Sequence, residues 1–213
     1  MNTFLPPRLF EPGPLLLATH NPGKIKEFRD LLEPFGIDIR STEEFNIDDP
    51  PETETTFAGN ARLKAQHACR IAGIPALADD SGLSVRGLDG QPGICSARWA
   101  GPERNFNLAM NKIRDGLIER FGSFEHADHH ASFIAVLCLF WPDGHGEFFE
   151  GRVDGRLIAE PRGAGGFGYD PIFIPDGETR TFAEMQPREK SCLSHRARAT
   201  RKLVDSCFPS MSS

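Results

Sequence analysis

A short apolar run that ends in two adjacent carboxylates constrains the fold of this chain most. In the segment Pro75–Leu83, apolar residues are followed by Asp79, Asp80 and a Ser-Gly pair. An apolar run of this length is typical of a buried strand, and the carboxyl ends of strands in open α/β sheets are where such sheets bind ligands. Because strand side chains alternate, we expect Asp79 and Asp80 to face opposite sides. Taken alone, the segment fits a turn with an Asx cap better than a ligand site, and the rest of the chain reverses that preference.

The overall composition narrows the class of protein. The 213 residues suffice for one large domain or two smaller lobes with a sizeable core. The formal net charge of −6 argues against a general nucleic-acid binder, because such proteins carry basic faces. The cysteines are scattered, without a C-x-x-C pair, which fits a reducing cytoplasm. Since no apolar run is long enough to cross a bilayer, we expect no membrane segment.

Helices and strands are predicted to alternate along the chain, which favours an α/β layer fold, and a hairpin near its middle implies a mixed sheet. The domain is expected to span 14–208, after a flexible lead at 1–13 and before a tail at 209–213. We expect a long loop over 86–101. Apolar spacing predicts strands at 15–18, 37–39, 76–80, 132–141, 147–153 and 171–174, and helices at 22–35, 56–71, 103–121 and from about 191–194 to 208.

The first junction between strand and helix, Thr19–Lys24, is a candidate anion site. Asn21 is placed to cap the helix, with Pro22 at its first position. The first amides of a helix attract anions, and Lys24 adds a full charge at the same place. The segment lacks the Walker P-loop pattern, so an ordinary helix start remains the alternative.

Carboxylates in an acidic loop are candidate metal ligands. Glu52 and Glu54 precede the second helix, and together with Asp80 they offer the hard oxygen atoms that Mg²⁺ binds; a solvated acidic loop is the alternative. On that helix, Asn60 and Lys64 lie one turn apart and face the same side. An ordinary surface pair would have the same spacing.

A glycine-rich segment, Gly165–Asp170, carries two aromatic residues. Glycines let a backbone approach a ligand closely, and Phe167 and Tyr169 suit stacking on a nucleic-acid base. A packed turn between strands is the alternative.

Basic residues gather at the start of the last helix. Lys190, His195 and Arg196 lie there, and Arg and His side chains donate hydrogen bonds to carbonyl or phosphate oxygens. A basic first turn opposes the helix dipole, which favours an anionic or carbonyl-bearing partner. The histidine-rich segment 126–130 is interpreted as an exposed loop rather than a metal site, because it lacks a pattern for a fourth ligand.

Taken together, these motifs resemble the inosine triphosphate pyrophosphatase family over about Leu15–Val204. The resemblance rests on the order of the motifs rather than on any one of them. They are Thr19–Lys24; Glu52 with Thr56-Phe57 and Asn60-Ala61; Ala78–Leu83; Pro92–Arg98; and Gly165–Asp170 followed by Lys190–Arg196.

The resemblance implies a fold of two lobes on a long mixed β-sheet with flanking helices, with the nucleotide in the cleft between the lobes. It implies a cytoplasmic homodimer that uses Mg²⁺ to hydrolyse deaminated purine nucleoside triphosphates (ITP, dITP, XTP) to the monophosphate and pyrophosphate. Carried over by motif, Asp80 is the general base, and Glu52 and Asp80 hold the metal. The implied substrate contacts are Thr19, His20, Asn21, Pro22, Gly23, Lys24, Asn60, Lys64, Ser81, Phe167, Gly168, Tyr169, Asp170, Lys190, His195 and Arg196.

One position departs from the family pattern. Relatives usually carry Glu before the Asn60-Ala61 pair, whereas this chain has Gly59, so the site is one carboxylate poorer. Two other functions therefore stay open at this point. One is a Maf-like pyrophosphatase of modified pyrimidine nucleotides, and the other is a nucleotide-binding sensor without catalysis.

Overall fold

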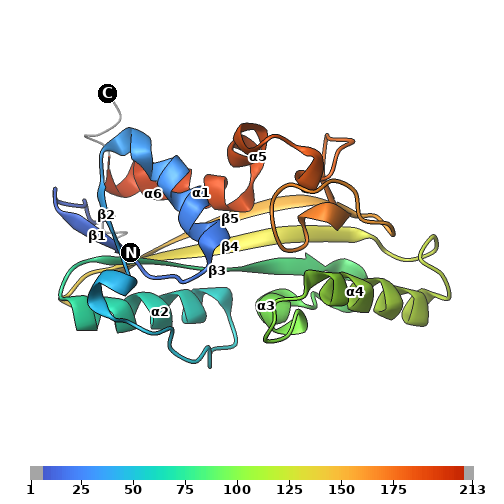
Figure 1. Ribbon diagram of the computed structural model, residues 1–213, viewed down its shortest axis with the longest axis horizontal. Coiled ribbons are helices and arrows are strands. Elements are labelled where there is room, and N and C mark those ends of the chain that lie inside the picture. Colours follow the sequence, from blue (N-terminus) through green and yellow to red (C-terminus); the bar gives the residue numbers. More distant parts are fainter. Residues whose placement is uncertain (1–6, 209–213) are drawn as a thin grey trace, which may run out of the picture. The chain divides into compact units, whose positions relative to one another are not determined.

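A six-stranded sheet forms the framework of the fold, in the order β2-β1-β3-β4-β5-β6 (Figure 1). β1 runs parallel to β2 and β3, whereas β5 and β6 are antiparallel, so the sheet is mixed as predicted. The strands are β1 (Pro14–Leu17), β2 (Asp38–Ser41), β3 (Ala76–Val85), β4 (His130–Phe140), β5 (Gly146–Leu157) and β6 (Phe173–Pro175). The helices are α1 (Pro22–Leu32), α2 (Phe57–Ala72), α3 (Ser96–Trp99), α4 (Phe106–Phe121), α5 (Pro187–Leu193) and α6 (His195–Cys207).

The chain divides into two compact units in this computed structural model, which describes residues 7–208. β3, β4, β5 and α6 each continue from one unit into the other, because every boundary between the units falls inside one of these elements. Of the described residues, the first unit contains 7–80, 136–150 and 197–208, and the second contains 81–135 and 151–196.

In the first unit, helices cover both faces of the sheet. Figure 1 shows α1 and α6 on one side of the strands and α2 on the other. The buried face of α2 is made of alanines, including Ala61 and Ala65, and packs with Leu16 and Ala78 of the strands. Such small side chains let the helix axis lie close to the sheet, so longer side chains on α2 reach β3 directly.

Capping residues set the ends of α1 and α2 as the sequence predicts. The side chain of Asn21 accepts hydrogen bonds from the backbone N–H groups of Gly23 and Lys24. Thr56 caps α2 in the same way through the N–H of Gly59. α2 ends at Gly73, whose φ of 72° is in the left-handed region that favours glycine.

In the second unit, one apolar core holds the helices against the strands. It includes Val85, Ile113 and Leu117 together with the aromatic residues Phe133 and Phe173. The rings of Phe133 and Phe173 meet edge to face at 4.8 Å between centroids, a favoured geometry for aromatic pairs.

Three predicted segments differ from the structure. β3 does not end in a turn after Asp80 but continues through Gly82 to Val85, because Leu83 and Val85 are fully buried in the second unit's core. The last helical region forms two helices instead of one, because the backbone of Ser194 is extended (ψ 154°) between α5 and α6. The predicted loop over 86–101 contains the short helix α3.

The segment 7–13, which we expected to be a flexible lead, makes specific contacts within the first unit. The ring of Phe10 packs on that of Phe208, with 4.8 Å between centroids, and its N–H donates to the carbonyl oxygen of Cys207 at 2.8 Å. Arg8 pairs with Asp143 and lies over the ring of Trp141. This segment therefore joins the end of α6 to the β4–β5 hairpin. The predicted tail at 209–213 lies outside the described residues.

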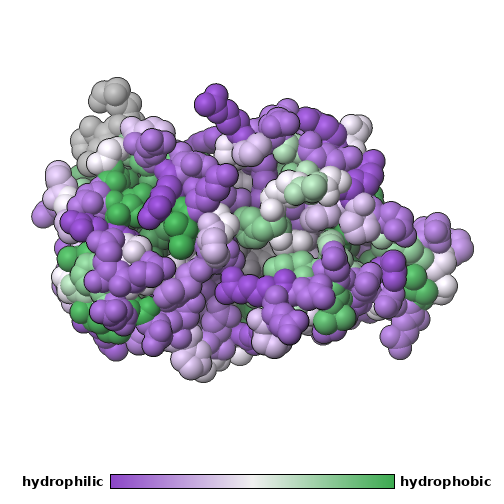
Figure 2. Space-filling view, viewed as in Figure 1, coloured by the Kyte–Doolittle hydropathy of each residue, from purple (hydrophilic) through white to green (hydrophobic). Residues whose placement is uncertain are grey.

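The described surface offers no segment for a bilayer. Within 7–208, none of the helices combines the length and the apolar character that crossing a membrane needs. Figure 2 shows a mostly hydrophilic face on which apolar residues form separate patches.

Candidate active site

Asp79 and Asp80 point to opposite sides of β3, as strand alternation predicts. Asp79 is bound from α1: Lys24 Nζ donates to its Oδ1 at 3.3 Å and to its carbonyl oxygen at 3.2 Å. Asp80 is bound from α2, where Lys64 Nζ donates to its Oδ1 at 2.9 Å and Asn60 Nδ2 to its Oδ2 at 3.3 Å. Since α1 and α2 cover different faces (Figure 1), only Asp80 belongs to the group of side chains described next.

Lys64 joins the acidic loop to β3. Its Nζ also donates to Glu52 Oε1 at 2.9 Å, so one ammonium group bridges Glu52 and Asp80. Asn60 Oδ1 accepts the backbone N–H of Glu54 at 3.1 Å. We call Glu52, Asn60, Lys64 and Asp80 the carboxylate–lysine cluster. The sequence predicted all of its members, and the structure brings them together.

Burial dominates the electrostatics of this cluster. Only 5% of Asp80 is exposed, and loss of hydration raises the pKa of its carboxyl group, against the opposite pull of Lys64 and Lys24. Burial also disfavours the charge on Lys64, but Asp80 and Glu52 outweigh it and hold the pKa of Lys64 above its ordinary value. Asp80 is thus a stronger proton acceptor than an exposed aspartate, while Lys64 stays charged.

The donor set of the cluster fits Mg²⁺. Glu52 and Asp80 bring carboxylate oxygens to the same ammonium group, each at 2.9 Å, and two carboxylates completed by water and phosphate oxygens are a usual set for Mg²⁺. Among residues 7–208 no three His, Cys, Asp or Glu side chains gather closely enough to hold an ion by themselves. An ion bound here would therefore draw further oxygens from a ligand.

The first backbone amides of α1 already have hydrogen-bond partners within the protein, which the sequence did not imply. The N–H groups of Gly23 and Lys24 are both hydrogen-bonded to Asn21 Oδ1, at 3.0 and 3.3 Å, and Thr19 Oγ1 accepts the N–H of Asn21 at 3.2 Å. The predicted phosphate contacts in Thr19–Lys24 therefore meet capped amides, so the positive charge of Lys24 is the main attraction for an anion there. Their contacts with a nucleotide stay predictions.

His20 holds this junction to the following loop. Its Nδ1 lies 2.9 Å from Asp49 Oδ1 and its Nε2 lies 3.1 Å from Thr42 Oγ1. Because both ring nitrogens already contact the protein, we retain only the backbone of His20 as a predicted ligand contact.

The His20–Asp49 pair makes a testable pH prediction. The hydrogen bond that His20 donates to the Asp49 carboxylate raises the pKa of His20 above 6.5, although partial burial of the ring lowers it. The pair therefore stabilises the fold fully below pH 6.5 and loses that contribution as pH rises through the folded-state pKa. We expect Asp49→Asn to lower the His20 pKa in an NMR titration of the ring. Asp48→Asn, an equal charge change one residue away, should leave it nearly unchanged; equal shifts in the two variants would contradict a specific pair.

In the second unit, a buried arginine contacts the residue that follows Asp80. Arg196 is 1% exposed and donates from Nη2 to Ser81 Oγ at 3.0 Å. Its guanidinium carbon lies 5.8 Å from the centroid of the Phe167 ring. Lys190 Nζ lies 4.7 Å from the same centroid and donates to Asp170 Oδ2 at 2.7 Å. We call Ser81, Phe167, Asp170, Lys190 and Arg196 the aromatic–cation cluster.

Glycine is required beside Asp170. A Cβ atom at Gly166 would lie 2.0 Å from Asp170 Oδ2, and the φ of Gly166 is 69°. The closeness lets the Asp170 carboxylate accept the N–H of Phe167 at 2.8 Å, which fixes the turn that carries the Phe167 ring. The glycine-rich segment is thus a packed turn that also presents an aromatic ring.

Tyr169 and His195 are buried and make contacts inside the second unit, and their predicted contacts with a nucleotide stay predictions. Tyr169 is 2% exposed and its hydroxyl donates to the carbonyl oxygen of Ser96 at 2.8 Å, so its ring is not offered for stacking. His195 is buried and stacks on Phe133 with 4.8 Å between centroids. Sequence reasoning gave Ser96 no role, although it lies in the motif Pro92–Arg98 and also accepts the N–H of Leu83 through Oγ.

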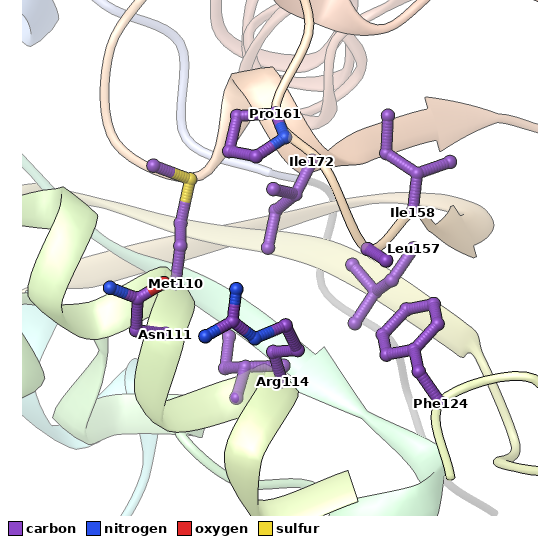
Figure 3. Close-up of a pocket in the computed structure, with 10 residues that line it drawn as sticks. Met110, Asn111, Arg114, Phe124, Leu157, Ile158, Pro161 and Ile172 are labelled. Atoms are coloured by element: carbon purple, nitrogen blue, oxygen red, sulfur yellow. The ribbon is translucent and has the colours of Figure 1, made fainter. Parts of the chain in front are cut away.

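The pocket in Figure 3 is a different feature of the second unit. It lies between α4 and the end of β5 and is lined mainly by apolar side chains such as Met110, Leu157 and Ile172. Its free space is about 10 Å³, roughly that of one water molecule. None of the predicted site residues lines it, and it is too small for a nucleotide.

The chain is similar to several known proteins over nearly its whole length. A dITP/XTP pyrophosphatase of Bradyrhizobium is 50% identical over 203 residues, covering 92% of this chain and 94% of that protein. A dITP/XTP pyrophosphatase of Caulobacter vibrioides is 51% identical over 194 residues, covering 91% and 97%. The solved structure of a HAM1 protein from Coxiella burnetii superposes with a TM-score of 0.82 at 37% identity, covering 90% of this chain and 96% of that one.

The family assignment rests on nearly the whole chain. The model of the Ham1 family matches residues 15–206, which include both clusters described above. The chain belongs to the Ham1 family.

Proposed function

We propose that this protein hydrolyses deaminated purine nucleoside triphosphates, namely ITP, dITP and XTP, to the monophosphate and pyrophosphate. The observation that carries the proposal is the buried Asp80 carboxylate, held by Lys64 and Asn60 in a chain of the Ham1 family. The relatives named as dITP/XTP pyrophosphatases support this substrate class. They do not favour a Maf-like enzyme for pyrimidine nucleotides.

The proposed reaction is attack of water on the α-phosphorus. Asp80 accepts a proton from the water as its oxygen bonds to the α-phosphorus, and the bond from that phosphorus to the bridging α–β oxygen breaks. The bridging oxygen keeps the bonding electrons and leaves with pyrophosphate. The raised pKa of Asp80 suits this role, because a base works best when its pKa approaches the operating pH.

We propose that three lysines, Lys24, Lys64 and Lys190, neutralise the phosphate groups. Lys24, Lys64 and Lys190 are each held by a carboxylate within the protein, which orients their ammonium groups. Glu52 and Asp80 would hold Mg²⁺, whose charge stabilises phosphate oxygens as negative charge builds on them. Each lysine needs only a change of partner to bind phosphate.

The aromatic–cation cluster would recognise the base. Phe167 is the ring available for stacking, since Tyr169 is in the core, and stacking contributes about 1–3 kcal/mol per base where it has been measured. Arg196 and nearby amides donate to the 6-oxo group of a deaminated purine. The 6-amino group of adenine is itself a donor and would face these protein donors without forming a hydrogen bond. Buried polar mismatches of this kind favour the matched substrate over the mismatched one by roughly 10⁴-fold in kcat/KM.

We further propose that the protein works in the cytoplasm as a homodimer. The cysteines found among residues 7–208 are all free thiols, and Cys192 is exposed, which suits a reducing compartment. The dimer rests on family resemblance alone and is checked by light scattering of the purified chain.

Pyrophosphate release tests the function directly. We expect rapid release from ITP and XTP with Mg²⁺, little after chelation of the metal, and little from ATP or UTP. GTP belongs in the panel because it shares the 6-oxo group. Strong binding of ITP without any release would identify a sensor instead of an enzyme, and a preference for UTP would reject the purine assignment.

A further inference from the structure

Gly59 of α2 lies directly against Glu54 of the acidic loop. A Cβ atom at position 59 would be 2.7 Å from Glu54 Cβ, 3.0 Å from Glu54 Cγ and 3.1 Å from Thr56 Oγ1. Carbon atoms in favourable contact are about 3.5–4.0 Å apart. The closest atom is the first of the Glu54 side chain, so rotation of that side chain cannot relieve the contact. Any residue other than glycine at position 59 must move the loop backbone.

The glycine is not explained by its backbone conformation. Gly59 lies within α2 and is absent from the glycines with positive φ among residues 7–208. Glycine is a poor helix former, so alanine would be expected at such a position on propensity alone. The close approach of Glu54 is the remaining reason for glycine there.

The backbone of Glu54 is attached to the carboxylate–lysine cluster. Its N–H donates to Asn60 Oδ1 at 3.1 Å, while Nδ2 of the same amide donates to Asp80 Oδ2 at 3.3 Å. Two residues earlier in the loop, Glu52 is bound to Lys64 at 2.9 Å. A shift of the backbone at Glu54 is thus passed to Asn60 and to Glu52, which both orient groups around Asp80.

We propose that Glu54 and Gly59 are a matched pair of positioning residues for Asp80 and Glu52. Gly59 leaves room for the stem of the Glu54 side chain, so that the loop can lie where Asn60 and Lys64 hold both carboxylates. The catalytic part of this inference rests on the proposed function.

A double-mutant cycle tests the pair. We expect Gly59→Ala to lower kcat/KM for ITP by about 10- to 100-fold, mostly in kcat, because displacements near 1 Å cost this much in well-organised sites. Glu54→Gly removes the Cβ and Cγ atoms that a side chain at position 59 would meet. The activity of the double variant is therefore compared with that of Glu54→Gly. Glu54→Gly/Gly59→Ala should match Glu54→Gly and recover most of the loss. The KM for ITP should stay nearly unchanged in Gly59→Ala, because the change misplaces groups around Asp80 and does not touch the residues assigned to the purine base.

Gly116→Ala in α4 is the matched control. A Cβ atom there would meet only the side chain of Leu88, with Cδ2 at 3.4 Å and Cδ1 at 3.9 Å, so we expect activity equal to that of the unmodified protein. Wild-type activity in Gly59→Ala, or a double variant as impaired as Gly59→Ala, would overturn the pair. A Gly59→Ala variant that fails to fold supports the pair if the double variant folds and is active, and overturns it if the double variant also fails.

Thermal unfolding separates this inference from the proposed function. If the unmodified protein releases no pyrophosphate from ITP, the proposed function fails and the catalytic role of the pair fails with it. The contact itself is then judged by the melting temperatures of the four proteins. A Tm loss in Gly59→Ala that Glu54→Gly reverses supports it, and additive changes reject it.

Discussion

Asp80→Asn is expected to reduce the turnover of ITP by about 10²- to 10⁴-fold, the usual contribution of a general base, while ITP still binds. Asn keeps the size of the side chain but cannot accept the proton from water. Lys64 keeps Glu52 as a partner at 2.9 Å, so the substitution does not leave the buried ammonium group without a carboxylate partner. Calorimetric binding and pyrophosphate release would be measured on the same preparation.

The pH profile adds a second reading of the same variant. The base must be ionised, so activity falls as pH drops below the pKa of Asp80. Because burial raises that pKa, the acid limb should lie above the ordinary aspartate value of 3.8 and should vanish in Asp80→Asn. Asp30→Asn, an exposed aspartate on α1, is the matched control and should behave as the unmodified protein. If Asp80→Asn turns over ITP within about threefold of the normal rate, Asp80 is not the general base.

Arg196→Lys is expected to cost on the order of 10²-fold in kcat/KM for ITP and to narrow the preference for ITP over ATP. Lysine retains the charge but loses the planar fork of donors, which recognises a carbonyl oxygen and the Ser81 hydroxyl together. Arg196 is only 1% exposed, so the substitution can also change the stability of the fold. The melting temperature of the variant must therefore be measured together with its kinetics.

Arg198→Lys provides the comparison for Arg196. Arg198 lies two positions further along α6 and is exposed, so kcat/KM of the Arg198→Lys variant should equal that of the unmodified protein. An Arg196→Lys protein that folds normally and still prefers ITP over ATP by the original factor would show that base selection resides elsewhere. In that case the aromatic–cation cluster would keep only its stacking role.

Local signals in the sequence predicted the parts of the structure that depend on neighbours in the chain. Asn21, Thr56 and Gly73 act at helix ends through bonds within a few residues, so their patterns are readable without a structure. The alternation of Asp79 and Asp80 follows from strand geometry alone. The motif order then pointed to the family, which the comparisons show.

Features that depend on distant segments escaped prediction. β3 continues past Asp80 because Leu83 and Val85 enter a core built from residues far along the chain. Nothing local reveals that the hydroxyl of Tyr169 reaches the carbonyl oxygen of Ser96, 73 positions earlier in the chain. The contact of Glu54 with Gly59 spans only five positions, yet it depends on a loop whose path is set by Lys64 and Asn60.

The contact of Phe10 with Cys207 and Phe208 has a consequence for how the protein is made. Domains generally fold as units while the ribosome is still adding residues, and the second unit needs nothing beyond Arg196. The first unit must wait for α6, the last helix to emerge. A nascent chain stalled before that helix would expose the apolar surface meant for it, making premature termination near the end nearly as damaging as an early stop.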